Sequence, residues 1–374
     1  MLEIEQLIDL RCALHRQPEV AGSEERTAKI LASFLRQQNP DELVKDVGGR
    51  GIIAIYKGEK PGRTVLLRCD MDALPLSEKL DISHGSLNPG VSHKCGHDGH
   101  MAIMCGVAQW LGKNKLSDGR VMLLFQPAEE TGQGAWKVIS QLTMENRPDI
   151  CFALHNLPGF PMGSVISGKG LFAGASRGLV VKFTGKCSHA AQPEEGINPA
   201  LAVASLIQYF SSVSRNDEGI LMTLVHADIG EAAFGTAPGN ATVMATLRAP
   251  TGETMQQLSL DVQKEIIKIA AGNDLQYTLE WTEEFPPTTN GELPDSIVER
   301  AAEKLGFQRI TIGKPFPWSE DFGHFTEKYP SALFGLGAGT DSPPLHSPEY
   351  DFPDMLIPYG IRMFKEIIER SLKL

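Results

Sequence analysis

The most constraining feature of this sequence is a short cluster of side chains suited to binding metal. The stretch Cys95-Gly96-His97-Asp98-Gly99-His100 contains a thiol, two imidazoles and a carboxylate. This mixture suits zinc, manganese, cobalt or nickel, whereas calcium and magnesium prefer oxygen ligands alone. The cluster therefore predicts a metal site, and it requires a fold that gathers the remaining ligands around it.

Further candidate ligands lie far downstream. Glu129 and Glu130 follow an apolar run, residues 121–125, that has the length and composition of a buried strand. His155 ends a second such run, and His346 lies in a loop rich in glycine and proline near the C-terminus. The candidate ligands are Cys95, His97, Glu130, His155 and His346.

This set exceeds what one tetrahedral ion needs, and a catalytic ion must also keep a position open for water or substrate. Two ions that share a bridging ligand solve this, as is common in hydrolases. Glu129 is then left over, well placed to take a proton from water and pass it to a leaving amine. Whether Cys95 bridges both ions or binds one stays open.

Further motifs span nearly the whole length of the chain. Besides the cluster, they are Leu14-His15-Arg16-Gln17-Pro18-Glu19, Asp70-Met71-Asp72-Ala73-Leu74-Pro75, Gln126-Pro127-Ala128-Glu129-Glu130, Ala153-Leu154-His155, Ser188-His189-Ala190, Ser319-Glu320-Asp321-Phe322 and Leu345-His346-Ser347-Pro348. By these motifs and their order, the chain resembles the co-catalytic metallopeptidase family of aminoacylases and carboxypeptidase-G2-type enzymes. The resemblance is to the amidohydrolase branch, which includes hippurate hydrolases, auxin-conjugate hydrolases and N-acetyldiaminopimelate deacetylases.

The resemblance implies a role for each of these residues. It makes Cys95, His97, Glu130, His155 and His346 ligands of two divalent ions, whose identity (zinc, manganese, cobalt or nickel) it leaves open. Glu129 would be the general base and then the general acid. Asp72 would orient a metal-binding imidazole. Other branches carry a metal-binding histidine where this chain has Asp70, and Cys95 compensates here.

The resemblance also implies residues outside the metal site. His189 would reach the active site of a partner subunit and stabilise the oxyanion, which makes a homodimer the expected assembly. Arg248 would hold a substrate carboxylate with two hydrogen bonds. Many relatives carry an asparagine where this chain has Gly235, so recognition of the substrate differs at that position.

The pattern of apolar runs predicts an α/β fold. Strands that alternate with helices indicate a largely parallel sheet flanked by helices. Ser23 is the expected N-cap of the second helix. The predicted helices are 4–16, 23–38 and 100–111, and the predicted strands are 51–56, 64–68, 121–125 and 151–155.

A second pattern begins near residue 175. It runs strand, helix, strand, strand, helix, strand, which is the ferredoxin-like order. We therefore expect a discontinuous catalytic domain, 1–174 and 287–374, interrupted by an inserted lid and dimerisation domain, 175–286. The predicted elements of the insert are 176–184, 198–214, 221–228, 242–249, 254–271 and 275–283.

The composition of the chain restricts the kinds of partner that we expect it to bind. The net charge of −11, from 35 basic and 46 acidic residues, argues against binding nucleic acid. No apolar stretch approaches the ~20 residues that cross a bilayer, so no membrane partner is expected. The acidic residues 1–5 do not resemble a signal peptide, and the six cysteines lack the spacing of a disulfide framework. We therefore expect a cytoplasmic protein.

Other chemistries are less well supported. The sequence has no Gly-x-Ser-x-Gly elbow, His-Glu-x-x-His helix or Walker loop, although Cys95 could act as a nucleophile. The expected function is metal-dependent hydrolysis of the amide bond of N-acyl amino acids to a carboxylic acid and a free amino acid. The alternatives are a metallo-dipeptidase or carboxypeptidase acting on short peptides, or a catalytically silent scaffold. The acyl group and the preferred amino acid stay open.

Overall fold

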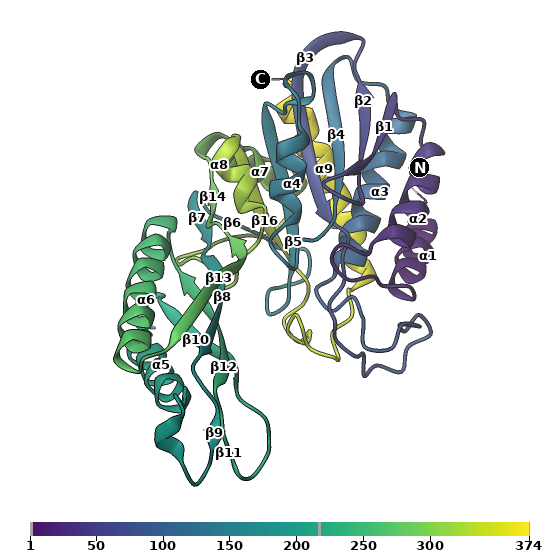
Figure 1. Cartoon of the computed structure of the whole chain (residues 1–374). Coiled ribbons are helices and arrows are strands. Elements are labelled where there is room, and N and C mark those ends of the chain that lie inside the picture. The colour runs from purple at the N-terminus through teal and green to yellow at the C-terminus, as the bar shows by residue number, and fades with distance from the viewer. Residues whose placement is uncertain (1–2, 216–217, 374) are drawn as a thin grey trace. The chain divides into compact units, whose positions relative to one another are not determined.

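The computed structural model describes residues 3–215 and 218–373, which form two compact units (Figure 1). The large unit comprises the described residues up to Phe172 together with Thr288–Lys314 and those from Glu320 onward. The small unit comprises Ala173–Pro287 and Pro315–Ser319. We expected that last segment in the catalytic domain. It belongs to the small unit because Phe316 pairs there with Ala173 and its carbonyl accepts a hydrogen bond from Gly174 N (3.1 Å).

The large unit is built on an eight-stranded sheet in the described part of the chain. Its central strands β4, β3, β5 and β16 are mutually parallel, whereas β1, β2 and β6 add antiparallel pairs. Strands β5 and β16 are buried throughout, which explains why they are continuous apolar runs. In spatial order the strands are β1 (Glu42–Val47), β2 (Gly51–Lys57), β4 (Asp118–Gln126), β3 (Lys60–Asp70), β5 (Ile150–Leu157), β16 (Ser331–Gly337), β6 (Val165–Ser167) and β15 (Arg309–Thr311).

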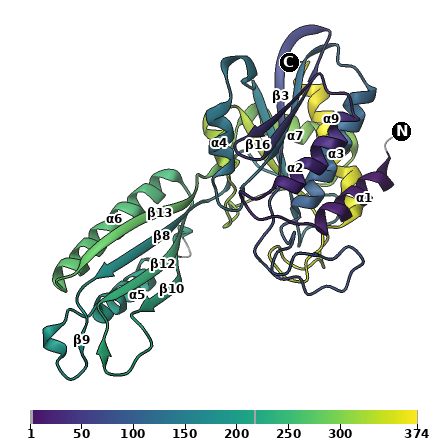
Figure 2. The same cartoon turned by 45° about the vertical axis from the view of Figure 1, so that its right-hand side comes forward.

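Helices cover both faces of this sheet (Figures 1 and 2), so the predicted mostly parallel α/β fold is confirmed. Helices α3 and α9 pack against β3, with α1 against α3 and α7 against α9, while α4 contacts β1 and β4 from the opposite side. A short ribbon pairs β7 (Gly170–Ala173) with β14 (Thr288–Asn290). The helices are α1 (Ile4–His15), α2 (Glu25–Arg36), α3 (His97–Lys113), α4 (Gly134–Gln141), α7 (Glu292–Leu305), α8 (Gly323–Lys328) and α9 (Ile357–Ser371), with 3-10 turns at Met144–Asn146 and Asp354–Leu356.

The predicted cap of α2 is wrong. The helix begins at Glu25, the N-cap position is Glu24, and its side chain does not cap the helix. Instead the carboxylate of Glu19 accepts hydrogen bonds from Arg26 N (3.1 Å) and Thr27 N (2.8 Å). A carboxylate from the preceding turn therefore satisfies the first amides of the helix in place of Ser23.

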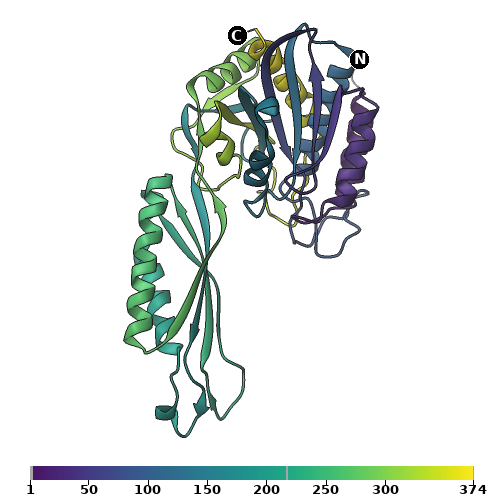
Figure 3. The ribbon, with the colours of Figure 1, turned by 45° about the horizontal axis from the view of Figure 1, so that its top comes forward.

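The small unit has a core of its own. Its four-stranded sheet has the order β10-β12-β8-β13 with antiparallel neighbours, and α5 and α6 lie on one face (Figure 3). This is the predicted ferredoxin-like arrangement. Its elements are β8 (Ala175–Thr184), β9 (Ser188–His189), the 3-10 turn Pro193–Glu195, α5 (Ala200–Val213), β10 (Leu221–Ile229), β11 (Thr236–Ala237), β12 (Asn240–Ala249), α6 (Gly252–Gly272) and β13 (Gln276–Phe285).

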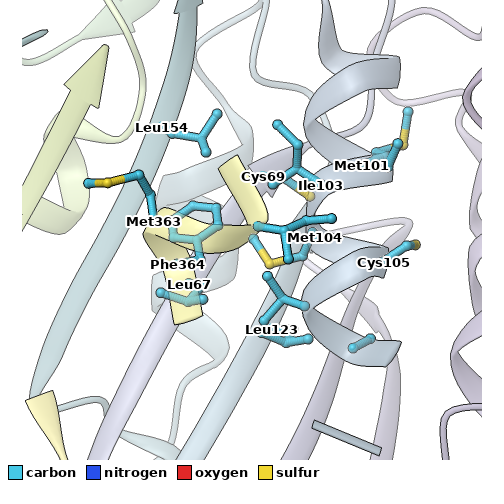
Figure 4. Close-up of a cluster of buried hydrophobic side chains, with 14 of the residues drawn as sticks. Leu67, Cys69, Met101, Ile103, Met104, Cys105, Leu123, Leu154, Met363 and Phe364 are labelled. Atoms are coloured by element: carbon cyan, nitrogen blue, oxygen red, sulfur yellow. The ribbon is translucent and has the colours of Figure 1, made fainter. Parts of the chain in front are cut away.

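The core of the large unit joins its central strands to α3 and α9 (Figure 4). Leu67 of β3 and Leu123 of β4 lie near Met104 of α3 and Phe364 of α9, and all four side chains are at most 1% exposed. These contacts fix α3, whose first residue is His97, on the sheet. No helix among the described residues is both long and apolar enough to cross a membrane.

We expect Phe364→Ala to lower the free energy of unfolding by ~3–5 kcal/mol, because it leaves a cavity beneath α3 and α9. Urea denaturation of the variant measures the change. Met355→Ala is the control, because Met355 is 69% exposed and its loss should change stability by less than ~0.5 kcal/mol. Equal effects from the two variants would contradict this description of the core.

Candidate metal centre

The predicted ligands gather at the carboxyl ends of neighbouring parallel strands. Glu130 follows β4, His155 lies in β5, and Cys95 and His97 stand where the chain after β3 enters α3. His346 follows β16 and is held in place because its N–H donates to the carbonyl of Lys94 (2.8 Å). Parallel strands end at one edge of a sheet, which is where α/β proteins place their sites.

The donor atoms form two overlapping groups. Atoms of Cys95, His97 and His155 lie within 4.8 Å of one another, and so do atoms of Cys95, Glu130 and His346. Cys95 Sγ is 3.5 Å from His155 Nε2, and His346 Nε2 is 3.9 Å from Glu130 Oε2. Cys95 belongs to both groups, which is the position a bridging ligand would occupy.

The hydrogen bonds around these residues test whether they fit metal ions. His97 Nδ1 donates to the carbonyl of Asp72 (2.8 Å), and His155 Nδ1 donates to that of Asn156 (2.9 Å), so each ring presents Nε2 as its electron-pair donor. His97 Nε2 and Glu130 Oε1 are buried and have no hydrogen-bond partner among the described residues. Leaving such atoms unpaired costs ~1–3 kcal/mol each. Divalent cations would supply the missing partners.

Burial sets the charge state of the donors. It lowers the pKa of His97 well below the usual range and that of His155 to about 4, so both rings are neutral, as metal ligands must be. Burial, followed by the charge of Glu130, raises the pKa of the Cys95 thiol well above its usual range. A nearby cation is therefore needed to hold Cys95 as a thiolate.

Glu129 belongs to neither of these two groups, although one of its oxygens lies within 4.8 Å of donor atoms of His97 and Glu130. Its Oε2 is 3.9 Å from His97 Nε2, and its Oε1 accepts a 3.4 Å hydrogen bond from Asp321 N. Burial, and next the charge of Glu320, raises the pKa of Glu129 well above its usual range. This carboxylate therefore has an enhanced affinity for a proton, which suits a group that must take one up and deliver it.

Asp72 acts differently from the role that the resemblance implied. Its side chain does not hold an imidazole, because Oδ1 is 3.8 Å from His97 Nδ1, too far for a hydrogen bond. The backbone carbonyl of Asp72 orients His97 instead. The carboxylate accepts hydrogen bonds from Glu129 N (3.0 Å) and Glu130 N (2.9 Å), so it fixes the turn that carries both glutamates.

Four further side-chain contacts support the site and were not predicted from the sequence. Asp70 contacts His100 Nδ1 (2.6 Å), and the other ring nitrogen of His100 meets the side chain of Asn156. Burial opposes protonation of His100, but the charge of Asp70 outweighs it and raises the pKa of the ring. The fully buried Arg68 binds Asp70 (2.9 Å) and Asp321 (2.6 Å). The sequence feature that could have indicated this buried ion pair is Arg68 itself, a charged residue at the end of an apolar run.

The small unit holds the other predicted residues. His189 is exposed, and its Nδ1 accepts a hydrogen bond from Ala191 N (3.1 Å), so the proton resides on Nε2. Gly235 has φ +86°, and its carbonyl accepts from Ala190 N (2.9 Å). Arg248 Nη1 donates to the carbonyl of Pro317 (3.2 Å).

Comparison with known proteins now gives the family. Residues 66–370 match the family described as Peptidase family M20/M25/M40. The chain belongs to this family. It is 30% identical over 379 residues to the IAA-amino acid hydrolase ILR1-like 4 of Arabidopsis thaliana, covering 98% of this chain and 86% of the relative. It is also 30% identical to an N-acetyldiaminopimelate deacetylase of Lactobacillus helveticus, covering 96% of each.

A solved structure agrees with these relatives. A protein from Bacillus subtilis, described as a dinuclear metal binding peptidase from M20 family, superposes with a TM-score of 0.82 at 26% identity and covers 99% of this chain and 98% of its own. The expected family and its amidohydrolase branch are confirmed, and this M20 protein is an enzyme of the metal-dependent amidohydrolase class.

A buried charge network anchors the ligand helix of this M20 enzyme to α1. Asp98, which follows His97 in α3, binds Arg11 (3.0 Å) and His15 Nδ1 (2.8 Å), and His15 Nε2 contacts Glu78 (3.0 Å). Burial works against the charge on His15, but the carboxylate of Asp98 outweighs it and raises the pKa of the ring to about 9.

We therefore expect stability to depend on the proton of His15. A raised pKa contributes stability that is complete below the unfolded value of about 6.5 and is lost as the pH rises through about 9. The difference in urea midpoint between the wild type and His15→Gln should shrink across this window, while the exposed His226→Gln serves as control. A constant difference would contradict a charged His15.

Proposed function

We propose that this M20 enzyme cleaves the amide bond of N-acyl amino acids and releases a carboxylic acid and a free amino acid. The observation that carries the proposal is the buried Glu129 beside two donor groups that share Cys95. The relatives support it, since they are named for hydrolysis of an IAA–amino acid and deacetylation of N-acetyldiaminopimelate.

In this proposal two divalent ions, drawn from zinc, manganese, cobalt or nickel, are held by Cys95, His97, Glu130, His155 and His346. When bound, they acidify a water and polarise the acyl carbonyl. Glu129 takes a proton from the attacking water as the new carbon–oxygen bond forms. It then delivers that proton to the nitrogen as the carbon–nitrogen bond breaks. Asp321 N–H and the surrounding burial hold this carboxylate in place.

The same proposal gives the small unit the task of recognition. Arg248 holds the substrate carboxylate, since a guanidinium can bind it with two hydrogen bonds. Substrates of this kind carry a negative charge, and the net charge of −11 means that only a local cation can attract them. Gly235 presents no side chain to the substrate, so recognition at this position differs from that of relatives with asparagine.

We further propose a homodimer formed through the small unit. Strand β10 is an edge strand of its sheet and exposes Leu224, Val225 and Ile229, an unpaired apolar edge of the kind that pairs with another chain. His189 of the partner subunit then donates its Nε2–H to the oxyanion.

We also propose a cytoplasmic location. The cysteines support it, because all six are free in the described chain.

A panel of substrates tests the proposed reaction. We expect release of free amine from a subset of N-acetyl, N-benzoyl and N-indoleacetyl amino acids with added manganese or zinc, and none with a chelator. Glu129→Gln should abolish turnover while two metal equivalents stay bound, because the amide cannot move a proton. Cleavage of dipeptides alone would favour the peptidase alternative. Turnover that survives in Glu129→Gln would remove its role.

Mixed dimers test the proposed role of His189. His189→Ala should lower kcat by about 10²–10³ through loss of an oxyanion donor. A hybrid of one His189→Ala subunit and one Glu129→Gln subunit, purified through two different tags, should recover about half the wild-type kcat, because one of its two sites is complete. A hybrid as inactive as its parents would show that His189 does not act across a dimer.

A further inference from the structure

Three consecutive backbone amides at the catalytic turn point to buried carboxylates. Glu129 N and Glu130 N donate to the two oxygens of Asp72 (3.0 and 2.9 Å). The preceding amide, Ala128 N, donates instead to Glu24 Oε1 (2.9 Å), a residue 104 positions away in the sequence. The turn that presents Glu129 and Glu130 is thus held from two sides by carboxylates.

The geometry of the turn explains why it needs them. Ala128 has φ +53°, a left-handed conformation that non-glycine residues adopt at a cost of ~1–2 kcal/mol. A left-handed residue in a turn can direct successive backbone N–H groups into one concavity that binds an anion. Here Glu129 N and Glu130 N converge in this way on the carboxylate of Asp72. Gly134 N closes the opposite side by donating to the Ala128 carbonyl (3.0 Å). The conformation is therefore maintained by its hydrogen bonds rather than by the preference of alanine.

Among the described residues, the side chain of Glu24 accepts hydrogen bonds only from Ala128 N and from the neighbouring Gly22 N, so the contact with the turn best accounts for its burial. Its side chain is 0% exposed, although it stands at the start of an amphipathic surface helix. It does not cap that helix, because Glu19 does so. Its Oε1 also accepts from Gly22 N (2.9 Å), while Oε2 has no partner among the described residues. Burying a carboxylate with one unpaired oxygen is unfavourable, so a compensating role is expected.

We propose that Glu24 is a positioning residue that holds Ala128 in its left-handed conformation, so that the 128–130 turn aims Glu129 and Glu130. The inference rests on the proposed function insofar as Glu129 is the proton carrier there. Removing the acceptor leaves Ala128 N–H unpaired, so the turn relaxes toward ordinary backbone angles. Glu129 then moves off its working position, and Glu130 shifts with it.

Kinetics of four variants test the proposal at saturating metal. Glu24→Ala should lower kcat by ~10–100-fold, as loss of an outer support typically does, with KM nearly unchanged. Glu24→Gln keeps a carbonyl oxygen for Ala128 N–H and should restore most of kcat. In the double variant Glu24→Ala/Ala128→Gly, glycine adopts positive φ without strain and should recover part of the loss.

Glu19→Ala is the matched control. It removes a carboxylate that caps the same helix but makes no contact with the turn, so it should lower stability while leaving kcat as in the wild type. Glu24 would be merely structural if Glu24→Ala and Glu19→Ala had the same kcat, or if neither Glu24→Gln nor the Ala128→Gly change rescued activity.

A spectroscopic measurement separates this inference from the proposed function. In protein loaded with cobalt(II), the visible absorption reports the arrangement of the ligands, one of which is proposed to be Glu130. Glu24→Ala should change this spectrum, Glu24→Gln should restore it, and Glu19→Ala should leave it as in the wild type. These outcomes do not require knowledge of the substrate, so they hold even if no N-acyl amino acid is cleaved. An unchanged spectrum together with unchanged kcat in Glu24→Ala would overturn the role of Glu24.

Discussion

The large unit concentrates buried negative charge at one edge of its sheet, and the rest of the site follows from how that charge is balanced. Burial raises the pKa of Asp321 to about 7 and that of Asp72 to about 8. Ionisation of such groups opposes folding at neutral pH, because it is easier in the unfolded chain. The protein groups that face the carboxylates with positive charge are Arg68 and, when it is protonated, His100, whose pKa is raised by the charge of Asp70. The nearly inaccessible carboxylates are Asp70, Asp72, Glu129, Glu320 and Asp321.

From this excess we expect metal binding to stabilise the folded enzyme. Divalent cations at the two donor groups would neutralise charge that Arg68 and His100 leave uncompensated, and ligands that bind the native state stabilise it by mass action. The hydrophobic core beneath α3 and α9 then has a second purpose. It holds the amino end of α3 against the sheet, so the donors at the strand ends stay close together before any cation arrives.

Much of this arrangement was predictable because it depends on patterns that the chain displays locally. Each central strand is a continuous apolar run, and candidate ligands placed at the ends of such runs must meet at one edge when the strands are parallel. The ferredoxin-like order of the small unit was equally visible in its alternating elements. The ligand motifs completed the prediction, because their side chains define a chemistry by themselves.

The supports of the site could not be predicted in the same way. Glu24 and Ala128 are 104 residues apart, and their hydrogen bond joins a side chain to a backbone amide, which leaves no periodic trace in the sequence. Likewise Ser23 matched the usual N-cap chemistry, yet Glu19 satisfies the helix from outside it. A motif gives a residue type but not the atom that acts. The sequence therefore did not predict that the backbone carbonyl of Asp72, and not its carboxylate, orients His97.

Distance between donor atoms does not separate candidate metal ligands from the residues that hold those ligands in place. The hydrogen bonds that each donor atom already makes do separate them. Asp70, His97 and His100 also place donor atoms within 4.8 Å of one another, as do His97, Glu129 and Glu130, so distance alone allows further metal groups. Asp70 already accepts a hydrogen bond at each oxygen, from Arg68 and His100, and the second ring nitrogen of His100 contacts Asn156, so the polar atoms of both residues are satisfied without a metal ion. His97 Nε2, in contrast, has no such partner in the described structure. This contrast supports the proposal that Asp70 holds His100 and Arg68 in place while Cys95, common to the two donor groups described above, serves as a metal ligand.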